Sequence, residues 1–464
     1  MTPLDALINS EAVTLSISKQ KNRVISFLYI YSSVITAELF LYVYLQYLRI
    51  SHKISLTLHK RTDDTNPTTN LTMKTFCLHD APNRDNLLPL TFTRGIGDIR
   101  VGIITIIEKW EHFLSRKGYQ IVPEYLQKKY PTALDGETIV IRSGVLPDKN
   151  LVNAINKLNQ NQALFHKGKW IAVATQSKNI QYSSFDTEAF EKFEYENNIR
   201  EIEYPWNIFK LNDIELKSDF DIVTEGATSA PISETNRVIG NGRIFIHPTA
   251  TVEASILNTN DGDIYIGPKA EIMEGCMVRA PFALCKESTL KMGAKVYGAT
   301  TIGPNCKVGG ELNNVVIFGY SNKAHDGFLG NAVIGEWCNL GADTNNSNLK
   351  NNYAEVKVWN YPQQRFIRTG LQFCGLIMGD HSKCGINTMF NTGTVVGVSA
   401  NIFGSGFPRS FIPSYSWGGA LGFKNYDINQ ALDTARLVLE RRGLILNEID
   451  EDILRHIYQL SQEQ

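Results

Sequence analysis

The feature that most constrains the fold is a hydrophobic repeat with a period of six residues. Eight aliphatic residues follow one another at this spacing: Ile266, Ile272, Val278, Leu284, Leu290, Val296, Ile302 and Val308. Two shorter runs have the same spacing, namely Phe328, Ile334 and Leu340, and then Met378, Cys384, Phe390, Val396 and Ile402. Side chains repeat every 3.6 residues in a helix and every two in a strand, so neither explains a period of six.

A three-sided coil of short strands does explain this period. Each side points one aliphatic residue inward, and a tight turn, often with Gly after the aliphatic residue, makes the corner. One coil cannot bury its own inward residue, but stacked coils complete a continuous column. Each buried Ile or Leu then contributes on the order of 1.5–3 kcal/mol. The repeat therefore predicts a parallel β-helix over residues 236–420.

Two stretches interrupt the repeat, from Gly309 to Asn322 and from Asp343 to Ile377. The second contains Trp359, Tyr361 and Arg365. Irregular loops on a rigid scaffold often carry function. We expect both stretches to be insertions that protrude from the prism and form the walls of a pocket.

Other patterns flank the repeat. Residues 73–235 alternate between strand and helix patterns, which is typical of an α/β layer. Strands are expected at 76–79 and 138–142, and helices at 101–114 and 151–158. Residues 421–464 have apolar residues at helical spacing, which predicts two amphipathic helices packed on the prism.

Residues 1–72 do not match the rest of the chain. The stretch from Val24 to Tyr47 is apolar and long enough for a bilayer, which needs about 20 residues, but Glu38 would be costly there. A polar stretch up to Thr72, typical of a disordered linker, precedes Met73. Either a membrane anchor covers about residues 24–48, or translation starts at Met73, and we favour the second. A signal peptide fits poorly because the apolar stretch is too long.

Charge and cysteine content narrow the classes of function. The net charge is −1 and there is no long basic run, so nucleic acid is not expected as a partner. The seven cysteines are scattered, odd in number and without a C-x-x-C pair. Buried thiols in a reducing cytoplasm are therefore expected.

The repeat region is similar to a known enzyme family around the stretch Lys323-Ala-His-Asp-Gly-Phe-Leu-Gly330, which is followed by Ala332-Val-Ile-Gly335 and Asn339-Leu-Gly-Ala-Asp-Thr344. These residues resemble the acetyltransferase half of the bifunctional GlmU-like family. Its members acetylate glucosamine-1-phosphate from acetyl-CoA and then transfer a uridylyl group from UTP. The resemblance implies a left-handed β-helix and a homotrimer, with the acyl-CoA site between neighbours.

The same resemblance assigns roles to single residues. It makes His325 the general base and Asn348 a substrate-contacting residue, with Asn339, Lys323 and Phe328 as further substrate contacts. Phe328 stands where the family has Tyr, and Leu349 replaces another Tyr. The family's phosphate-binding Arg is absent around residues 307–310.

His325 suits the implied chemistry. An amine must lose a proton as it attacks a thioester, and an imidazole with a pKa near 6.5 accepts that proton well. Spacing alone leaves open that His325 is simply a corner residue. His381, in Gly379-Asp-His-Ser382, is the rival base, and we interpret it as a turn residue.

The N-terminal layer resembles a shortened sugar nucleotidyltransferase domain. Pro89-Leu-Thr91 matches that family, while Ala81-Pro-Asn-Arg84 replaces its Gly-rich turn. The family's metal-binding Asp is missing, and Arg142-Ser-Gly-Val-Leu-Pro-Asp148 stands near its place. We expect phosphate contacts from Arg84, Arg94 and Arg100, because guanidinium groups suit phosphate. An active domain would also need Mg²⁺.

Two functions remain open. The leading one is cytoplasmic sugar-nucleotide biosynthesis, with acyl transfer from acyl-CoA at the β-helix and nucleotidylyl transfer from a nucleoside triphosphate to a sugar phosphate in the N-terminal layer. The alternative is nucleotidylyl transfer alone, of the glucose-1-phosphate thymidylyltransferase type. In that case the β-helix is a non-catalytic oligomerisation or effector module.

Overall fold

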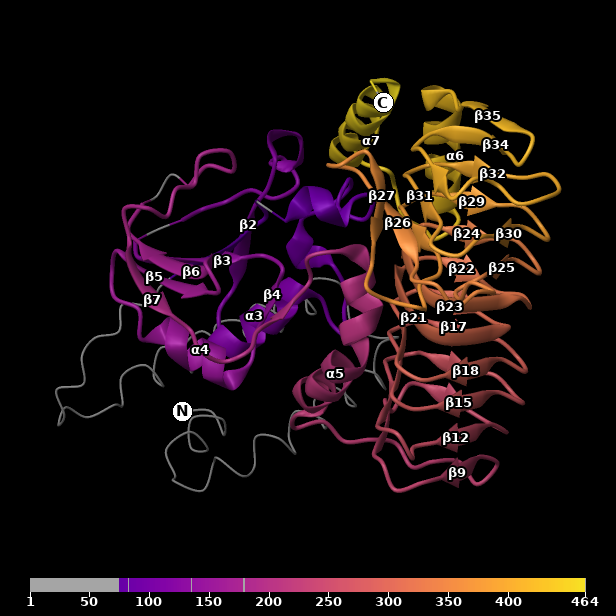
Figure 1. Cartoon of the computed structure of the whole chain (residues 1–464). Coiled ribbons are helices and arrows are strands. Elements are labelled where there is room, and N and C mark those ends of the chain that lie inside the picture. The colour runs from indigo at the N-terminus through magenta and orange to yellow at the C-terminus, as the bar shows by residue number, and fades with distance from the viewer. Residues whose placement is uncertain (1–74, 82, 135, 178–179, 464) are drawn as a thin grey trace, which may run out of the picture. The chain divides into compact units, whose positions relative to one another are not determined.

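The computed structural model describes residues 75–81, 83–134, 136–177 and 180–463 (Figure 1). These residues fall within one compact unit that spans Thr72–Gln464. The predicted membrane anchor and linker, with residues 1–72, lie outside them. Within the described ranges, none of the helices has the length and apolarity that crossing a membrane requires. The predicted domain boundaries after residues 72, 235 and 420 stay predictions.

The N-terminal layer is a mixed α/β structure, as predicted. Its six-stranded sheet has the order β2-β1-β3-β6-β5-β7, with β1 (Thr75–His79), β2 (Gly118–Ile121), β3 (Thr138–Arg142), β5 (Gln162–His166), β6 (Lys169–Thr175) and β7 (Glu191–Glu194). The strands β1 and β3 are parallel, and β6 runs antiparallel to β3. A separate pair joins β4 (Val145–Leu146) to β8 (Arg200–Glu201).

The helices of this layer are α3 (Ile106–Leu114), α4 (Lys149–Asn156) and α5 (Pro205–Thr224). The predicted helix at 101–114 begins only at Ile106, because Thr105 and Glu108 form a capping box there. The predicted helix at 151–158 is two residues earlier in the structure, where Asp148 accepts hydrogen bonds from the backbone of its first turn.

The C-terminal half is a parallel β-helix, which confirms the predicted fold (Figure 1). One sheet has 13 strands: β9 (Arg237–Ile239), β10 (Ile244–Ile246), β12 (Ile256–Asn258), β13 (Ile264–Ile266), β15 (Met277–Arg279), β16 (Phe282–Leu284), β18 (Lys295–Tyr297), β19 (Thr300–Ile302), β21 (Glu311–Gly319), β23 (Phe328–Glu336), β28 (Ile377–Met378), β31 (Val395–Val396) and β33 (Phe411–Ile412).

A second sheet of the β-helix has ten strands: β11 (Thr251–Val252), β14 (Glu271–Ile272), β17 (Thr289–Leu290), β20 (Lys307–Val308), β22 (Asn322–Lys323), β24 (Asn339–Leu340), β29 (Lys383–Cys384), β32 (Asn401–Ile402), β34 (Ser416–Gly419) and β35 (Gly422–Asn425). Two further pairs are β25 (Asn345–Asn346) with β30 (Met389–Phe390), and β26 (Lys357–Asn360) with β27 (Arg365–Arg368).

The aliphatic residues of the repeat form the inner column. All eight from Ile266 to Val308 are buried in one hydrophobic cluster. One predicted member is wrong. Leu329, not Phe328, pairs with the inward Leu312, and Leu329 is 1% exposed. Phe328 therefore points out of the column.

The first break in the repeat is not an insertion. The strand β21 runs without interruption past two successive sides of the coil below it, so that Leu312 pairs with Val296 and Ile317 with Ile302. These two inward residues are five positions apart rather than six. The corner between them is shorter, which shifts the register without creating a loop.

The second break is a true insertion, but it packs against the protein itself. It contains the β26–β27 hairpin. Trp359 stacks on Phe411 with ring centroids 4.3 Å apart, and Tyr361 meets Phe92 of the N-terminal layer edge-on at 5.5 Å. Trp359 therefore joins the insertion to the β-helix, and Tyr361 joins it to the layer.

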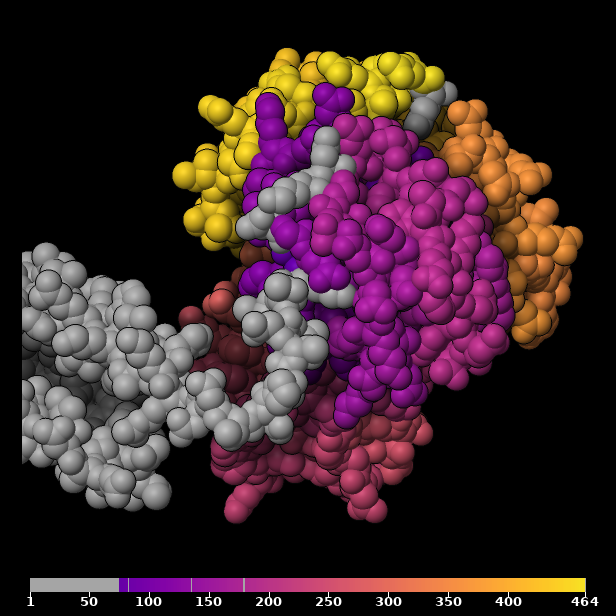
Figure 2. Space-filling view, turned by 90° about the vertical axis from the view of Figure 1, so that its left-hand side faces the viewer, coloured from indigo at the N-terminus to yellow at the C-terminus, as the bar shows by residue number. Residues whose placement is uncertain are grey.

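The layer, the β-helix and the C-terminal helices share one core. A single hydrophobic cluster contains Ile96 from the layer, Phe318 and Val333 from the β-helix, and Leu432 and Ile457 from the C-terminal helices. The two predicted helices are present as α6 (Ile428–Glu440) and α7 (Glu448–Gln462). In Figure 2 the yellow C-terminal helices lie beside the indigo part of the layer. Lys129 pairs there with Asp450 at 2.9 Å.

Candidate active site

His325 lies at the corner between β22 and β23, where both it and Asp326 are exposed. Among the described residues, no side chain or backbone group hydrogen-bonds its imidazole. Both ring nitrogens are therefore available to a bound molecule, as a general base requires.

Lys323 supports this corner from inside the column. It pairs with the inward Val308 and is 2% exposed. Its Nζ donates to the backbone carbonyls of His325 and Asp326. Burial lowers the pKa of Lys323 to about 8, although Asp326 and Asp343 act in the opposite direction. Its ammonium group thus points to the two carbonyls of the corner, and the expected substrate contact of Lys323 stays a prediction.

The side chains of Phe328 and Asn348 come together beside Gly330 of β23, and their substrate contacts stay a prediction. A Cβ atom at Gly330 would lie 2.5 Å from Cζ of Phe328 and 2.7 Å from Nδ2 of Asn348. Only glycine lets both side chains approach the strand so closely. The Nδ2 of Asn348 donates to Oδ1 of Asn331 at 2.8 Å.

A second polar residue inside the column, Asn346, holds this strand in place. It is 3% exposed and bonds both backbone groups of Gly330, with N–H···Oδ1 at 2.8 Å and Nδ2–H···O at 2.9 Å. Sequence reasoning missed this residue. The sequence feature that could have identified Asn346 is its position, six residues after the inward Leu340.

Asn339 lies elsewhere. It is exposed in β24 of the ten-stranded sheet, whereas Phe328 belongs to the 13-stranded sheet. Its cross-strand partner is Asn322, whose side chain accepts a hydrogen bond from Arg442 of the tail at 3.1 Å. The structure therefore does not group Asn339 with Phe328 and Asn348.

His381 is a corner residue, as predicted. Its backbone φ is +61°, and its ring lies parallel to that of Trp337, with centroids 6.2 Å apart. Burial lowers the pKa of His381 to about 3, and the neighbouring Lys383 acts in the same direction. Its ring is therefore a weaker base than an ordinary imidazole.

Arg84, which was expected to bind phosphate, is instead occupied by the protein. Its side chain is buried and donates to Asp80 at 2.9 Å and to the hydroxyl of Tyr125 at 3.0 Å. It also donates to the carbonyls of Arg94 and Thr91. Little donor capacity remains for a ligand.

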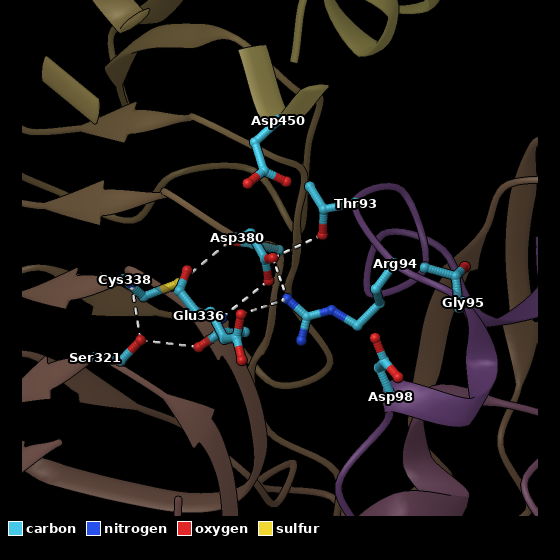
Figure 3. A network of polar contacts seen from close by, with 12 residues as sticks. Thr93, Arg94, Gly95, Asp98, Ser321, Glu336, Cys338, Asp380 and Asp450 are labelled. Atoms are coloured by element: carbon cyan, nitrogen blue, oxygen red, sulfur yellow. Dashed lines mark hydrogen bonds and ion pairs between the residues drawn. The ribbon is translucent and has the colours of Figure 1, made fainter. Parts of the chain in front are cut away.

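Arg94 joins the N-terminal layer to the β-helix (Figure 3). It forms a buried ion pair with Asp380 and a second pair with Glu336 at 3.2 Å. Thr93 donates to the same Asp380 carboxylate at 2.6 Å. Burial alone would lower the pKa of Arg94, but Asp380 and Glu336 outweigh it and raise that pKa.

Arg100 has a similar structural role. It donates to the carbonyl of Phe318 at 3.1 Å and to that of Ile103. The expected phosphate contacts of Arg84, Arg94 and Arg100 stay a prediction. All three guanidinium groups bond to protein acceptors that lie at or near the contact between the layer and the β-helix.

Asp80 follows β1, at the carboxyl edge of the parallel strands β1 and β3, where open α/β sheets bind ligands. Its carboxylate accepts hydrogen bonds from Ser143 at 2.8 Å, from the backbone of Ile96 and from Arg84. Across the part of the chain that the structure describes, no group of three His, Cys, Asp or Glu residues could hold a metal ion.

Comparison with known proteins agrees with this two-part organisation. Residues 76–228 match the sugar nucleotidyl transferase family model. A bifunctional sugar-1-phosphate nucleotidylyltransferase/acetyltransferase of Sulfurisphaera tokodaii is 27% identical over 271 residues, which are 57% of this chain and 60% of that relative. The bifunctional protein GlmU of Trichormus variabilis is 33% identical over 103 residues, 20% of this chain and 22% of that protein.

Among solved structures, LpxA from Bacteroides fragilis, a UDP-N-acetylglucosamine acyltransferase, aligns with a TM-score of 0.25 and 19% identity. The alignment covers 48% of this chain and 82% of that one.

Proposed function

We propose that this protein transfers an acyl group from acyl-CoA, most simply acetyl-CoA, to an amino sugar phosphate or a nucleotide sugar. The observation that carries this proposal is the exposed His325, whose imidazole has no partner among the described residues and whose backbone is held by Lys323. Phe328 and Asn348, which lie together at Gly330 in the strand that follows this corner, contact the sugar in this proposal. The named activity of the Sulfurisphaera tokodaii relative supports the same reaction.

The reaction proposed at His325 is a direct transfer. The amine nitrogen of the sugar attacks the thioester carbonyl carbon, forming a C–N bond and breaking the C–S bond. His325 accepts the proton that the amine loses, and the departing CoA thiolate is protonated in turn. Positioned bases of this kind contribute roughly 100- to 10,000-fold in rate. We further propose that the pathway is of the UDP-N-acetylglucosamine type.

Replacement of His325 tests the proposal. His325→Ala should lower the release of free CoA from acetyl-CoA, with glucosamine-1-phosphate as acceptor, by roughly 100- to 10,000-fold. The matched control is His247→Ala, because His247 follows β10 in another coil and its imidazole bonds only Thr249 among the described residues. Unchanged CoA release in His325→Ala would eliminate His325 as the base.

Nucleotidylyl transfer in the N-terminal layer is a second candidate, favoured by the family match over residues 76–228. Mg²⁺ usually needs only one or two carboxylates together with substrate phosphates, but Asp80 is already engaged. We therefore derive no step through Mg²⁺. Release of pyrophosphate from UTP or dTTP with a sugar-1-phosphate would support this activity. Such release without any CoA release would favour the non-catalytic alternative for the β-helix.

We also propose a homotrimer with the acyl-CoA site between neighbouring prisms, and a cytoplasmic location. Seven free, buried cysteines suit a reducing compartment. Light scattering at micromolar concentration should give three times the mass of the chain, and a monomer would contradict the proposed assembly.

A further inference from the structure

A cavity of about 380 Å³ lies in the N-terminal layer, and neither His325 nor the three arginines discussed above line it. Four segments form it: the end of β3, the turn between β5 and β6, the strand β8, and the first turns of α5. Its lining consists of Arg142, His166, Lys167, Lys169, Ile199, Arg200, Glu201, Asn207, Lys210 and Leu211.

The topology explains why these segments meet. Arg142 is the last residue of β3, which runs parallel to β1, so it lies at the carboxyl edge of the parallel strands. The strand β6 is antiparallel to β3, with Ile141 opposite Ala172, and this brings the turn at Lys167 to the same edge. Ligands of open α/β sheets bind outside the carboxyl ends of the strands.

The cavity has more cations than the protein neutralises. Lys169 pairs with Glu203 at 2.9 Å, and Arg200 pairs with Glu215 at 2.8 Å. Lys167 and Lys210 are exposed, and within the described residues neither ammonium group has an ion-pair partner. The remaining cation is Arg142.

Arg142 indicates independently that the cavity lacks a hydrogen-bond acceptor. It is 2% exposed, and its only carboxylate partner among the described residues is Glu201, at 3.1 Å. Glu201 also accepts a hydrogen bond from Asn83 at 2.6 Å. The Nε of Arg142 is buried without a hydrogen-bond partner. Buried donors are normally satisfied, so such a group calls for an explanation.

We propose that this cavity binds a small phosphorylated molecule through its phosphoryl group, with Arg142, Lys167 and Lys210 supplying the positive charge. A phosphoryl group is compact, multiply charged and rich in acceptors, and guanidinium and ammonium groups bind it strongly. The volume is within the range of small-molecule sites. The inference concerns binding alone, so it does not depend on acyl transfer at His325 or on turnover of a nucleotide.

Calorimetric titration of the full chain at low salt tests this inference. The probes are inorganic pyrophosphate, glucosamine-1-phosphate and UTP, with unphosphorylated glucosamine as a negative control. At least one phosphorylated probe should bind saturably with a Kd below about 1 mM, and the three probes together distinguish a sugar phosphate from a nucleotide as the ligand. No saturable binding by any of them would overturn the proposal.

Variants then locate the site. The double variant Lys167→Gln/Lys210→Gln changes only exposed side chains and should raise the Kd roughly 10- to 100-fold. Arg142→Met should weaken binding at least as much if it folds. Lys149→Gln, at an exposed lysine on α4, should leave the Kd unchanged. Equal weakening by Lys149→Gln, or none by the double variant, would refute the assignment.

Discussion

At the scale of single residues, Lys323 shows how an inward position can serve an outward site. The residues beside it in the column are aliphatic. A lysine among them lowers the stability of the fold, because a buried charge loses its hydration. The ammonium group recovers part of this cost by bonding two backbone carbonyls of the corner that contains His325. Lys323 is thus a positioning residue.

Replacing this lysine should separate stability from activity. In Lys323→Met the corner loses its support, so we expect CoA release to fall about tenfold, as for a misplaced catalytic group. The pKa of about 8 in the folded chain is below the usual 10.5. Between these values the unfolded chain binds more protons, so the stability of the natural protein relative to Lys323→Met should rise with pH.

Urea unfolding of both proteins at pH 7 and pH 9.5 measures this difference. The exposed Lys295→Met serves as the control for a lost surface charge. A stability difference between the natural protein and Lys323→Met that stays constant with pH would contradict the account of Lys323 as a buried, partly desolvated cation.

At the scale of elements, β23 carries Phe328 and lies against Asn348, the two residues that we assign to the acceptor. Gly330 in this strand leaves no room for a methyl group, because Phe328 and Asn348 both lie under 3 Å from the ideal Cβ position.

Gly330→Ala should therefore displace Phe328 and Asn348 and raise the KM for the sugar roughly tenfold, with a smaller effect on kcat. Steady-state kinetics with varied glucosamine-1-phosphate would measure this. Gly385→Ala is the matched control, since a methyl group there meets nothing closer than 3.5 Å. A change in kcat alone would argue that β23 does not contact the acceptor.

The repeat predicted the β-helix because every inward aliphatic residue must pack against the coils above and below it. The same logic could not show that the corner after Leu312 is one residue shorter, since turns of different length close the same coil. It could not show either that Arg94 binds a carboxylate of the protein rather than a phosphate. An arginine suits phosphate and carboxylate equally well, and its partner Asp380 is 286 positions away in the chain.

At the scale of the whole molecule, the layer and the β-helix are joined by buried charge as well as by a shared apolar core. Removing one partner of a buried ion pair leaves the other without compensation, which costs about 3–5 kcal/mol. Arg94→Met should therefore lower the free energy of unfolding by about this amount. Because the core is shared, unfolding of residues 75–463 should remain a single transition.

Urea unfolding followed by both tryptophan fluorescence and circular dichroism checks this expectation. Adding Asp380→Asn to Arg94→Met should recover part of the loss, because the second change removes the uncompensated carboxylate. Two separate transitions in the natural protein would show instead that the layer and the β-helix unfold independently.

The bond between Arg94 and Asp380 also bears on how genes for such chains can be recombined. A chimera that set this layer on a foreign prism without the matching carboxylate would bury a lone guanidinium, and selection would act against it at once. Each half of the chain thus depends on a charged side chain that the other half supplies. The layer and the β-helix should therefore be inherited together. Recombination should separate them only in chains that have lost both Arg94 and Asp380.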